Sequence, residues 1–371
     1  MSAATISVSR AEAPLAPIVA TTVLFLLFGS DWLAAPGNPL WFVFHFVWLF
    51  AVILWAALRV VHHAECLATK LGEPYGTLIL TLSVITIEVM MIATLMLHGR
   101  DTPSLARDTM FAVIMIVLNG LVGLTLLVGA LRYREQVYNL QGANAYLSVI
   151  IPLAVLALVL PDYTVSTSAP TLSGFQAAFL VVMCVALYGT FLAIQTVRHA
   201  GYFAAGDPGH PDNHGDHGRV IRSLPFHAAM LLAYMLPVVL LAKKIAIPID
   251  YGIETFGLPA ALGGFVVAAL VLTPEAIGAL EAVLEDRLQR SVNILLGSVL
   301  ATIGLTVPAV LMVSLATGET VELGLQHADF ALLLLTLVVS VVTFSAARTN
   351  LLQGMVHLIL FVAYLMLIFA P

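Results

Sequence analysis

The sequence has few charged residues and almost no cysteine, and both shortages exclude whole classes of protein. Only 10% of its 371 residues are charged and 61% are hydrophobic, whereas about 25% of residues are charged in a typical soluble domain. The two cysteines, Cys66 and Cys184, have no metal-type spacing and cannot form a disulfide framework. The formal net charge of −6 is small and spread over loops, which argues against a nucleic-acid partner. These shortages exclude a soluble domain and indicate an integral membrane protein.

Apolar runs of about 17–25 residues recur along the whole chain, and each is long enough to cross a lipid bilayer as a helix. The predicted fold class is therefore all-α integral membrane, with about eleven transmembrane helices. The first apolar run is followed by no small-residue cleavage site, so we expect a retained helix and not a cleaved signal. The predicted spans are 16–34, 39–62, 73–98, 106–131, 144–160, 172–197, 224–243, 256–282, 291–317, 328–347 and 350–370.

Lysine and arginine are distributed unevenly over the connecting segments. Eleven of the fifteen lie at the N-terminus and in every second loop. Because cytoplasmic loops are enriched in these residues, we expect a cytoplasmic N-terminus and a C-terminus on the opposite side. The one long polar break is then cytoplasmic and is either a solvated linker or a cation-binding and pH-sensing loop. Its candidate residues are Asp207, His210, Asp212, His214, Asp216 and His217.

Two glutamates lie in the middle of predicted spans, at matched positions of an internal repeat. Glu88 follows Gly76 by twelve residues and Glu275 follows Gly263 by the same spacing, at an offset of 187. Of all the charged residues, only these two are predicted to lie well inside the hydrocarbon. Ionisable residues at that depth are rare and usually functional. We therefore predict that both carboxylates bind ions or protons, and do more than tie helices together.

The match between the two halves continues after the glutamates. Arg107 precedes Asn119 by twelve residues, as Arg290 precedes Thr302, at an offset of 183. Each copy contains five spans, and an odd number inverts the second copy in the membrane, as in many secondary transporters. The predicted division is an N-terminus with a leading helix, a first five-helix repeat, a His/Asp-rich loop and a second five-helix repeat: 1–38, 39–198, 199–223 and 224–371.

Two carboxylates brought together in a medium of low dielectric cannot both ionise freely, so at least one holds a proton until a cation replaces it. A site that accepts either species and opens alternately to the two sides performs antiport. Oxygen ligands suit hard cations such as Ca²⁺. Ordinary helix packing also explains each of the further candidates for the site. These are Thr77, Thr81, Asn119, Ser298, Thr302 and Pro274.

Two other functions compete with cation exchange. A proton-coupled transporter of another small solute stays open as the alternative, although no basic residue lies at mid-depth. An intramembrane enzyme would need a nucleophile or a motif such as H-E-x-x-H, and none occurs. The H-H-x-E run at 62–65 lacks metal-ligand spacing, and we assign it no chemistry. His45, His227 and His357 fall near predicted helix ends and are interpreted as interfacial.

Long stretches around both glutamates resemble a known family. AECLATKLGEPYGTLILTLSVITIE and TPEAIGALEAVLEDRLQRSVNILLGSVLATIGLTVP are similar to two repeat signatures of the cation/proton exchanger (CAX) branch of the cation/Ca²⁺ exchanger superfamily. LYGTFLAIQTVRH and RTNLLQG resemble further signatures, and the likeness is greatest to bacterial ChaA-type antiporters.

This resemblance implies two inverted five-helix repeats, with Glu88 and Glu275 as the ion-binding acids of a bacterial inner-membrane protein. It also implies export of Ca²⁺, Na⁺ or K⁺ in exchange for H⁺, with these cations as cargo and no resident cofactor. Exchangers of the yeast and plant type carry G-N-x-x-E at both acids, whereas this chain has V-I-T-I-E and V-L-T-P-E. The smaller set of side-chain oxygens fits exchange of monovalent as well as divalent cations.

Overall fold

The structure is a computed structural model that describes residues 12–34, 39–72, 75–98, 103–167, 169–203, 222–346 and 348–370. The described residues are mostly helical and contain no strand, only an isolated bridge between Val137 and Arg348. Within these ranges, nine helices are long and apolar enough to cross a membrane. Two shorter apolar helices, Leu15–Leu27 and His327–Thr343, complete the eleven predicted spans. The all-α membrane fold class is confirmed.

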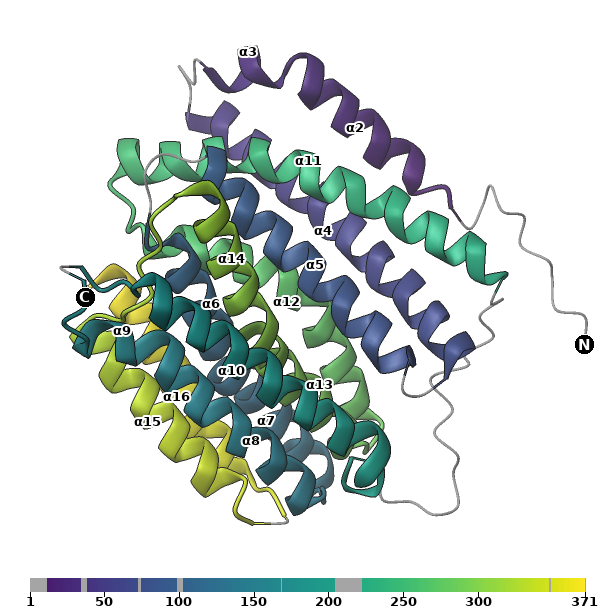
Figure 1. Ribbon diagram of the computed structural model, residues 1–371. Coiled ribbons are helices and arrows are strands. Elements are labelled where there is room, and N and C mark those ends of the chain that lie inside the picture. The colour runs from purple at the N-terminus through teal and green to yellow at the C-terminus, as the bar shows by residue number, and fades with distance from the viewer. Residues whose placement is uncertain are drawn as a thin grey trace, which may run out of the picture. The chain divides into compact units, whose positions relative to one another are not determined.

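The helices follow the predicted spans in order (Figure 1). The α-helices are α2 (Leu15–Leu27), α3 (Gly29–Ala34), α4 (Pro39–Leu71), α5 (Tyr75–His98), α6 (Leu105–Met115), α7 (Val122–Tyr133), α8 (Leu140–Ala154), α9 (Leu160–Tyr163), α10 (Gly174–Ala193), α11 (Leu224–Phe256), α12 (Ala261–Leu284), α13 (Leu288–Ala301), α14 (Val307–Thr317), α15 (His327–Thr343) and α16 (Leu351–Phe369). Four π-helical segments and one 3₁₀ turn interrupt or extend them: η1 (Ile116–Leu121), η2 (Val155–Val159), η3 (Ile194–Arg198), η5 (Thr302–Thr306) and the turn η4 (Ala200–Tyr202).

Matching helices of the two repeats share their lengths and their local details. The first helices, α4 and α11, have 33 residues each, and the second helices, α5 and α12, have 24 each. The third helix of each copy is interrupted by a π-helical segment, in α6–η1–α7 and in α13–η5–α14. The fifth helices, α10 and α16, both begin with a capping box, Ser173 with Gln176 and Asn350 with Gln353. These details support the repeat inferred from the sequence.

The predicted end of the span 224–243 is wrong, because α11 continues through Lys243 and Lys244 to Phe256. Two adjacent lysines suggest a loop when only the sequence is considered. In a helix, however, long lysine side chains can extend toward water and keep their charges solvated. At 1.5 Å per residue, a helix of this length spans about 50 Å, which exceeds the roughly 30 Å hydrocarbon core. The same holds for α4, which runs to Leu71 and not to residue 62.

The chain divides into two compact units, and each is described by itself. Unit 1 consists of Met1–Arg100 and Asn213–Gly257 and contains α2 to α5 and α11. In this unit α4 and α11 run side by side, and both contact α2 and α5 (Figure 1). Unit 2 consists of Asp101–Asp212 and Leu258–Pro371 and contains the other helices.

In unit 2, the third helix of each repeat packs against the fifth helix of the other repeat. Helix α7 and segment η1 contact α16, while α14 and η5 contact α10. The crossing of α7 with α16 is close, because a Cβ at Gly123 would lie 2.9 Å from the backbone nitrogen of Leu358. A Cβ at Gly354 would likewise lie 2.7 Å from the backbone nitrogen of Leu127. Small residues allow such close helix packing in membranes, and here they join the two repeats.

Candidate functional site

Glu88 lies in the middle of α5, as the fourteenth of its 24 residues. This places it about 20 Å of helix rise from Tyr75, and the residue is only 1% exposed. Of the two threonines predicted to support it, Thr81 is half-buried on the same helix, and the side chain of Thr77 lies outside the described part of the chain. Helix α5 therefore presents one buried carboxylate near its centre, as the sequence predicts.

Glu275 has the matching place in α12, as the fifteenth of 24 residues, and is half-buried. Pro274 precedes it inside a helix that continues without a break from Ala261 to Leu284. Because proline has no N–H, the carbonyl of Leu270 loses its usual helical donor four residues later. A backbone carbonyl released in this way is an oxygen of the kind that hard cations bind.

The threonines two residues before each glutamate make matching hydrogen bonds that the sequence analysis does not predict. Thr86 donates its hydroxyl proton to the carbonyl of Leu82 at 2.6 Å, and Thr273 donates to that of Ala269 at 2.7 Å. Hydroxyl bonds of this kind, four residues back along a helix, often bend it. The signal was present as a T-x-E pattern repeated at the offset of the glutamates, 187 residues.

Asn119 and Thr302 lie in two of the π-helical segments, η1 and η5, and both are buried, at 0% and 2% exposed. Turns of π-helix inside α-helices are frequent at functional sites. Ser298, one turn before Thr302, is half-buried on α13. Helix α12 contacts α13 and η1, and α13 contacts η1 and η5. Unit 2 thus brings together the elements that carry Glu275, Asn119, Ser298 and Thr302.

The carboxamide of Asn119 is held by two other helices of unit 2. Its Nδ2 atom donates to the hydroxyl of Thr336 in α15 at 2.8 Å, and its Oδ1 atom lies 3.3 Å from Nδ1 of His357 in α16. The other ring nitrogen of His357 lies 2.9 Å from the hydroxyl of Thr343. His357 is fully buried, so its interpretation as interfacial is wrong. The network orients Asn119 and ties η1 to α15 and α16.

His45 and His227 are not interfacial either, since they are 1% and 3% exposed. The ring of His45 contacts that of Phe25 in α2 edge to face, and its Nδ1 atom is 2.7 Å from the carbonyl oxygen of Trp41. His227 pairs with His63, with 3.0 Å between their Nδ1 atoms. Both residues lie close to helix ends in the sequence, but the packing of α2, α4 and α11 against one another covers them.

Glu88 belongs to unit 1 and Glu275 to unit 2, so the pairing of the two carboxylates in one site stays a prediction. The predicted loop residues Asp207, His210, Asp212, His214, Asp216 and His217 lie outside the described ranges. Across those ranges, no group of three His, Cys, Asp or Glu side chains could hold a metal ion.

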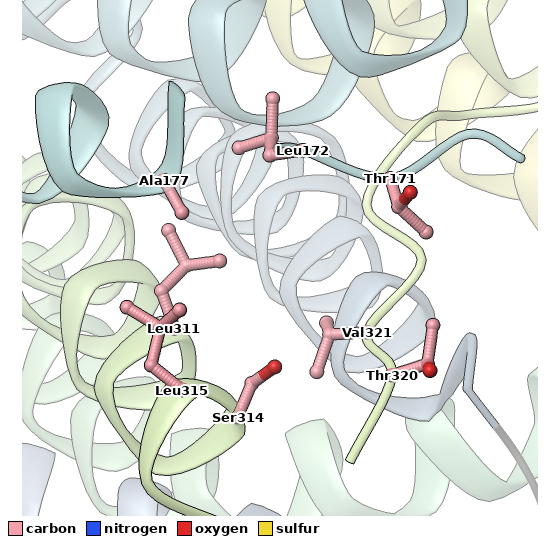
Figure 2. A pocket seen from close by; sticks show the side chains of 8 residues that line it. All are labelled: Thr171, Leu172, Ala177, Leu311, Ser314, Leu315, Thr320 and Val321. Carbon is pink, nitrogen blue, oxygen red and sulfur yellow. The ribbon is translucent and has the colours of Figure 1, made fainter. Parts of the chain in front are cut away.

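A cavity of about 190 Å³ in unit 2 contains none of the predicted site residues (Figure 2). Hydroxyls of Thr171, Ser314 and Thr320 line it together with apolar side chains, and its lining includes no charged group. The hydroxyl of Ser314 is already engaged, because it donates to the carbonyl of Glu319 at 2.6 Å. We assign no cation site to this cavity.

Residues 41–197 and 226–370 match the family described as sodium/calcium exchanger protein. The sodium-potassium/proton antiporter ChaA of Escherichia coli is 40% identical over 359 residues, which is 95% of each chain. The putative ionic transporter y4hA of Sinorhizobium fredii is 42% identical over 321 residues, which is 85% of this chain and 86% of that one. These matches confirm the resemblance to ChaA-type exchangers that the sequence indicated.

Solved exchanger structures share the fold at low sequence identity. Native YfkE aligns with a TM-score of 0.73 at 16% identity, covering 96% of this chain and all of that chain (100%). A structure named H⁺/Ca²⁺ exchanger CAX aligns with a TM-score of 0.64 at 13% identity, covering 96% of this chain and 88% of that one. The fold is thus that of membrane cation exchangers. Since the family match and the relatives extend over most of its length, the chain belongs to the sodium/calcium exchanger protein family.

Proposed function

We propose that this protein is a secondary antiporter that exports Na⁺, K⁺ or Ca²⁺ in exchange for protons across a bacterial inner membrane. The observation that carries the proposal is the presence of Glu88 and Glu275 near the centres of two matching 24-residue helices. A relative that is 40% identical over nearly the whole chain is named a sodium-potassium/proton antiporter. A membrane carboxylate without a transport role would not be expected twice at the same repeat position.

In the proposed cycle, a cation binds when the two carboxylates are ionised and leaves when they take up protons. Cation and protons compete for the same oxygens, so the site carries one or the other but not both. If the site opens alternately to the two sides, each crossing by a cation is coupled to a return crossing by protons. The proposed alternating access thus converts competition for Glu88 and Glu275 into antiport.

We infer that neutral oxygens complete the cation shell. The amide oxygen of Asn119 has a second lone pair beyond the one that faces His357, and Pro274 releases a backbone carbonyl on α12. Hard cations accept hydroxyl, amide and backbone oxygens together with carboxylates. The remaining members proposed for this shell are the hydroxyls of Thr77, Thr81, Ser298 and Thr302.

The proposed orientation has the N-terminus in the cytoplasm and the C-terminus in the periplasm. It rests on the eleven of fifteen basic residues that gather on the N-terminal side of the spans. In this orientation the break between the two repeats, residues 199–223, is cytoplasmic. We assign that segment the role of a linker between the repeats.

The test is proton flux in everted membrane vesicles that contain the full-length protein and a pH-sensitive dye. Na⁺, K⁺ and Ca²⁺ are added in turn to the wild type and to the variants Glu88→Gln and Glu275→Gln. We expect each variant to abolish cation-driven flux, because the amide cannot exchange a proton. Glu281→Gln is the matched control, since Glu281 is an exposed carboxylate on the same helix, α12, and it should retain full flux.

Full flux in either Glu88→Gln or Glu275→Gln would refute the proposed site. If the wild type responds to none of the three cations while the protein is inserted and folded, the cargo is another solute and the proposed exchange is wrong. The order of the responses among the three cations gives the selectivity directly.

A further inference from the structure

A buried cluster of polar side chains in unit 1 takes no part in the proposed exchange site. Glu12 lies just before α2, and its Oε2 atom is 2.7 Å from Nη2 of Arg59, 3.0 Å from the hydroxyl of Tyr234 and 3.4 Å from Nε2 of His63. The side chain of His63 is fully buried, and that of Glu12 is 11% exposed. Because Arg59 and His63 belong to α4 and Tyr234 belongs to α11, one carboxylate joins the N-terminal segment to both helices.

A chain of hydrogen bonds continues from this carboxylate to the start of α11. Nδ1 of His63 lies 3.0 Å from Nδ1 of His227, and Nε2 of His227 accepts the backbone N–H of Arg222 at 3.0 Å. A backbone N–H can only donate, so Nε2 of His227 carries no proton and Nδ1 of that ring must carry one. His63 then accepts at Nδ1 and donates from Nε2 to Glu12. The bonds to Glu12 at one end and to the Arg222 amide at the other thus fix the tautomers of both histidines, and both rings are neutral.

An additional proton on either ring breaks this chain. In protonated His227, Nε2–H would point at the backbone N–H of Arg222. In protonated His63, Nδ1–H would point at the Nδ1–H of His227. Two donors that face each other cannot hydrogen-bond, so each protonation removes a link. Histidine is the side chain that gains a proton in the range of pH that cells experience.

Burial at both rings, and the neighbouring charges at His227, also oppose an added proton. Arg59 acts on the ring of His63, while Lys70 and Arg222 act on that of His227, and Glu12 is the one carboxylate that acts on both. The neighbouring ring of His62 contacts His63 edge to face at 5.3 Å. A positive charge on His227 is thus placed among more cations than anions, whereas at His63 burial is the main obstacle to an added proton.

Glu12 itself stays ionised over the range in which histidines titrate. Burial acts to raise the pKa of Glu12, but hydrogen bonds from Arg59 and Tyr234, together with the charge of Arg59, lower its pKa below the ordinary value. A carboxylate with a lowered pKa stabilises the folded state at neutral pH and loses this effect only as the pH falls through its own pKa. A response between pH 8 and pH 5 therefore belongs to the histidines.

We propose that Glu12, His63, His227 and the Arg222 amide form a proton-operated latch. When both rings are neutral, the latch holds the start of α11 against α4, and protonation of either ring releases it, while Arg59 and Tyr234 keep Glu12 in place. Helix α5, which carries Glu88, packs against both α4 and α11. Release of the latch therefore loosens contacts of helices that touch α5. The latch does not depend on the proposed exchange mechanism.

The test uses a nitroxide spin label on the full-length protein in lipid nanodiscs. The label is attached to a cysteine introduced at Ser223, an exposed position at the start of α11, after the buried native Cys66 and Cys184 are replaced by serine. We expect an immobilised label at pH 8 and a mobile one at pH 5, with the change centred below the ordinary histidine value of about 6.5, because both rings are buried and cations lie near them.

Two variants separate the latch from a general effect of acid. The double variant His63→Gln with His227→Gln should lose the pH response, because neither amide gains a proton. His45→Gln should keep it, since His45 is another buried histidine of α4 that bonds only to Trp41 among the contacts described above. A label with the same mobility at pH 8 and pH 5 in the wild type overturns the proposal. A pH response that persists in the double variant overturns it as well.

Amide hydrogen exchange provides a second measurement that needs no substitution. Protonation of His227 frees the backbone N–H of Arg222, so its exchange, corrected for the intrinsic pH dependence, should be about tenfold faster at pH 5 than at pH 8. Equal corrected exchange at both values refutes the latch, even if the double variant fails to fold.

Discussion

Helices α7 and α16 cross so closely that one added methyl group should force them apart. In Gly354→Ala, the new Cβ would lie 2.7 Å from the backbone nitrogen of Leu127 and 2.9 Å from the carbonyl oxygen of Gly123. Both obstacles are backbone atoms, so no side chain can rotate away. Helix α16 must instead move by several tenths of an ångström, because ordinary contacts of this kind are longer than 3.4 Å.

The expected cost follows from overpacking, for which such forced shifts typically lower the free energy of unfolding by about 1–3 kcal/mol. The gain from replacing glycine by alanine inside a helix offsets at most about 1 kcal/mol of it. We therefore expect Gly354→Ala to lower the thermal stability of the detergent-solubilised protein, measured as the fraction that stays monodisperse after heating. The movement would also reach His357, three residues further along α16, and through it Asn119.

Gly189→Ala is the matched control, because a Cβ at this interior position of α10 meets nothing within 4 Å. It should be as stable as the wild type or slightly more stable. Gly123→Ala should destabilise like Gly354→Ala, and the double variant should cost less than the sum, since one displacement of α16 relieves both clashes. A Gly354→Ala protein as stable as the wild type would refute this account of the crossing.

Two further predictions concern buried polar groups of unit 2. Thr306→Val should raise thermal stability, with a gain of about 1 kcal/mol, because the Oγ1 atom of Thr306 is buried and has no hydrogen-bond partner in the described ranges. A less stable variant would show that this hydroxyl does form a hydrogen bond. His357→Leu should cost about 1–3 kcal/mol, since it removes the ring that lies between Asn119 and Thr343, and His357→Gln should recover part of the loss in the same melting assay. Equal stability of the leucine and glutamine variants would contradict the network.

The spans could be predicted from the sequence because the bilayer leaves so few solutions. A helix satisfies its own backbone, so the length and apolar character of a run suffice to identify it. The prediction of a span end failed at Lys243 and Lys244, which lie within the length of α11 and not after it. Whether a charged pair ends a helix or lies on the surface of a longer one depends on tertiary packing, which hydropathy does not contain.

Glu88 and Glu275 were equally accessible to sequence reasoning, since a carboxylate is a rare event inside an apolar run. The partners of Asn119 were not accessible. Its oxygen faces His357, which is 238 residues away in the chain, and no spacing rule links positions on helices so far apart. The interfacial interpretation of His357 failed for the same reason, because burial by neighbouring helices is not visible from closeness to a helix end.

The two π-helical segments show how the repeats depend on each other within unit 2. A Cβ at Gly120 in η1 would meet the ring of Phe361 on α16 at 3.3 Å, and a Cβ at Gly304 in η5 would meet the ring of Tyr188 on α10 at 3.0 Å. Each segment thus rests on an aromatic side chain of the other copy's fifth helix. A proposed ligand in either segment therefore lies in a part of its repeat that packs against the other repeat.

Segments η1 and η5 differ in the polar residue that each carries at the matching position. The amide of Asn119 in η1 is oriented by α15 and α16 through Thr336 and His357, whereas Thr302 at the matching place in η5 carries a hydroxyl, which has one donor and two acceptor sites. An oriented amide offers its oxygen in a fixed direction, and a hydroxyl can serve as donor or as acceptor. If both contribute to the proposed cation shell, Asn119 selects by geometry and Thr302 accommodates either a cation or a protonated carboxylate. The internal symmetry of the fold therefore does not extend to the chemistry of its two halves.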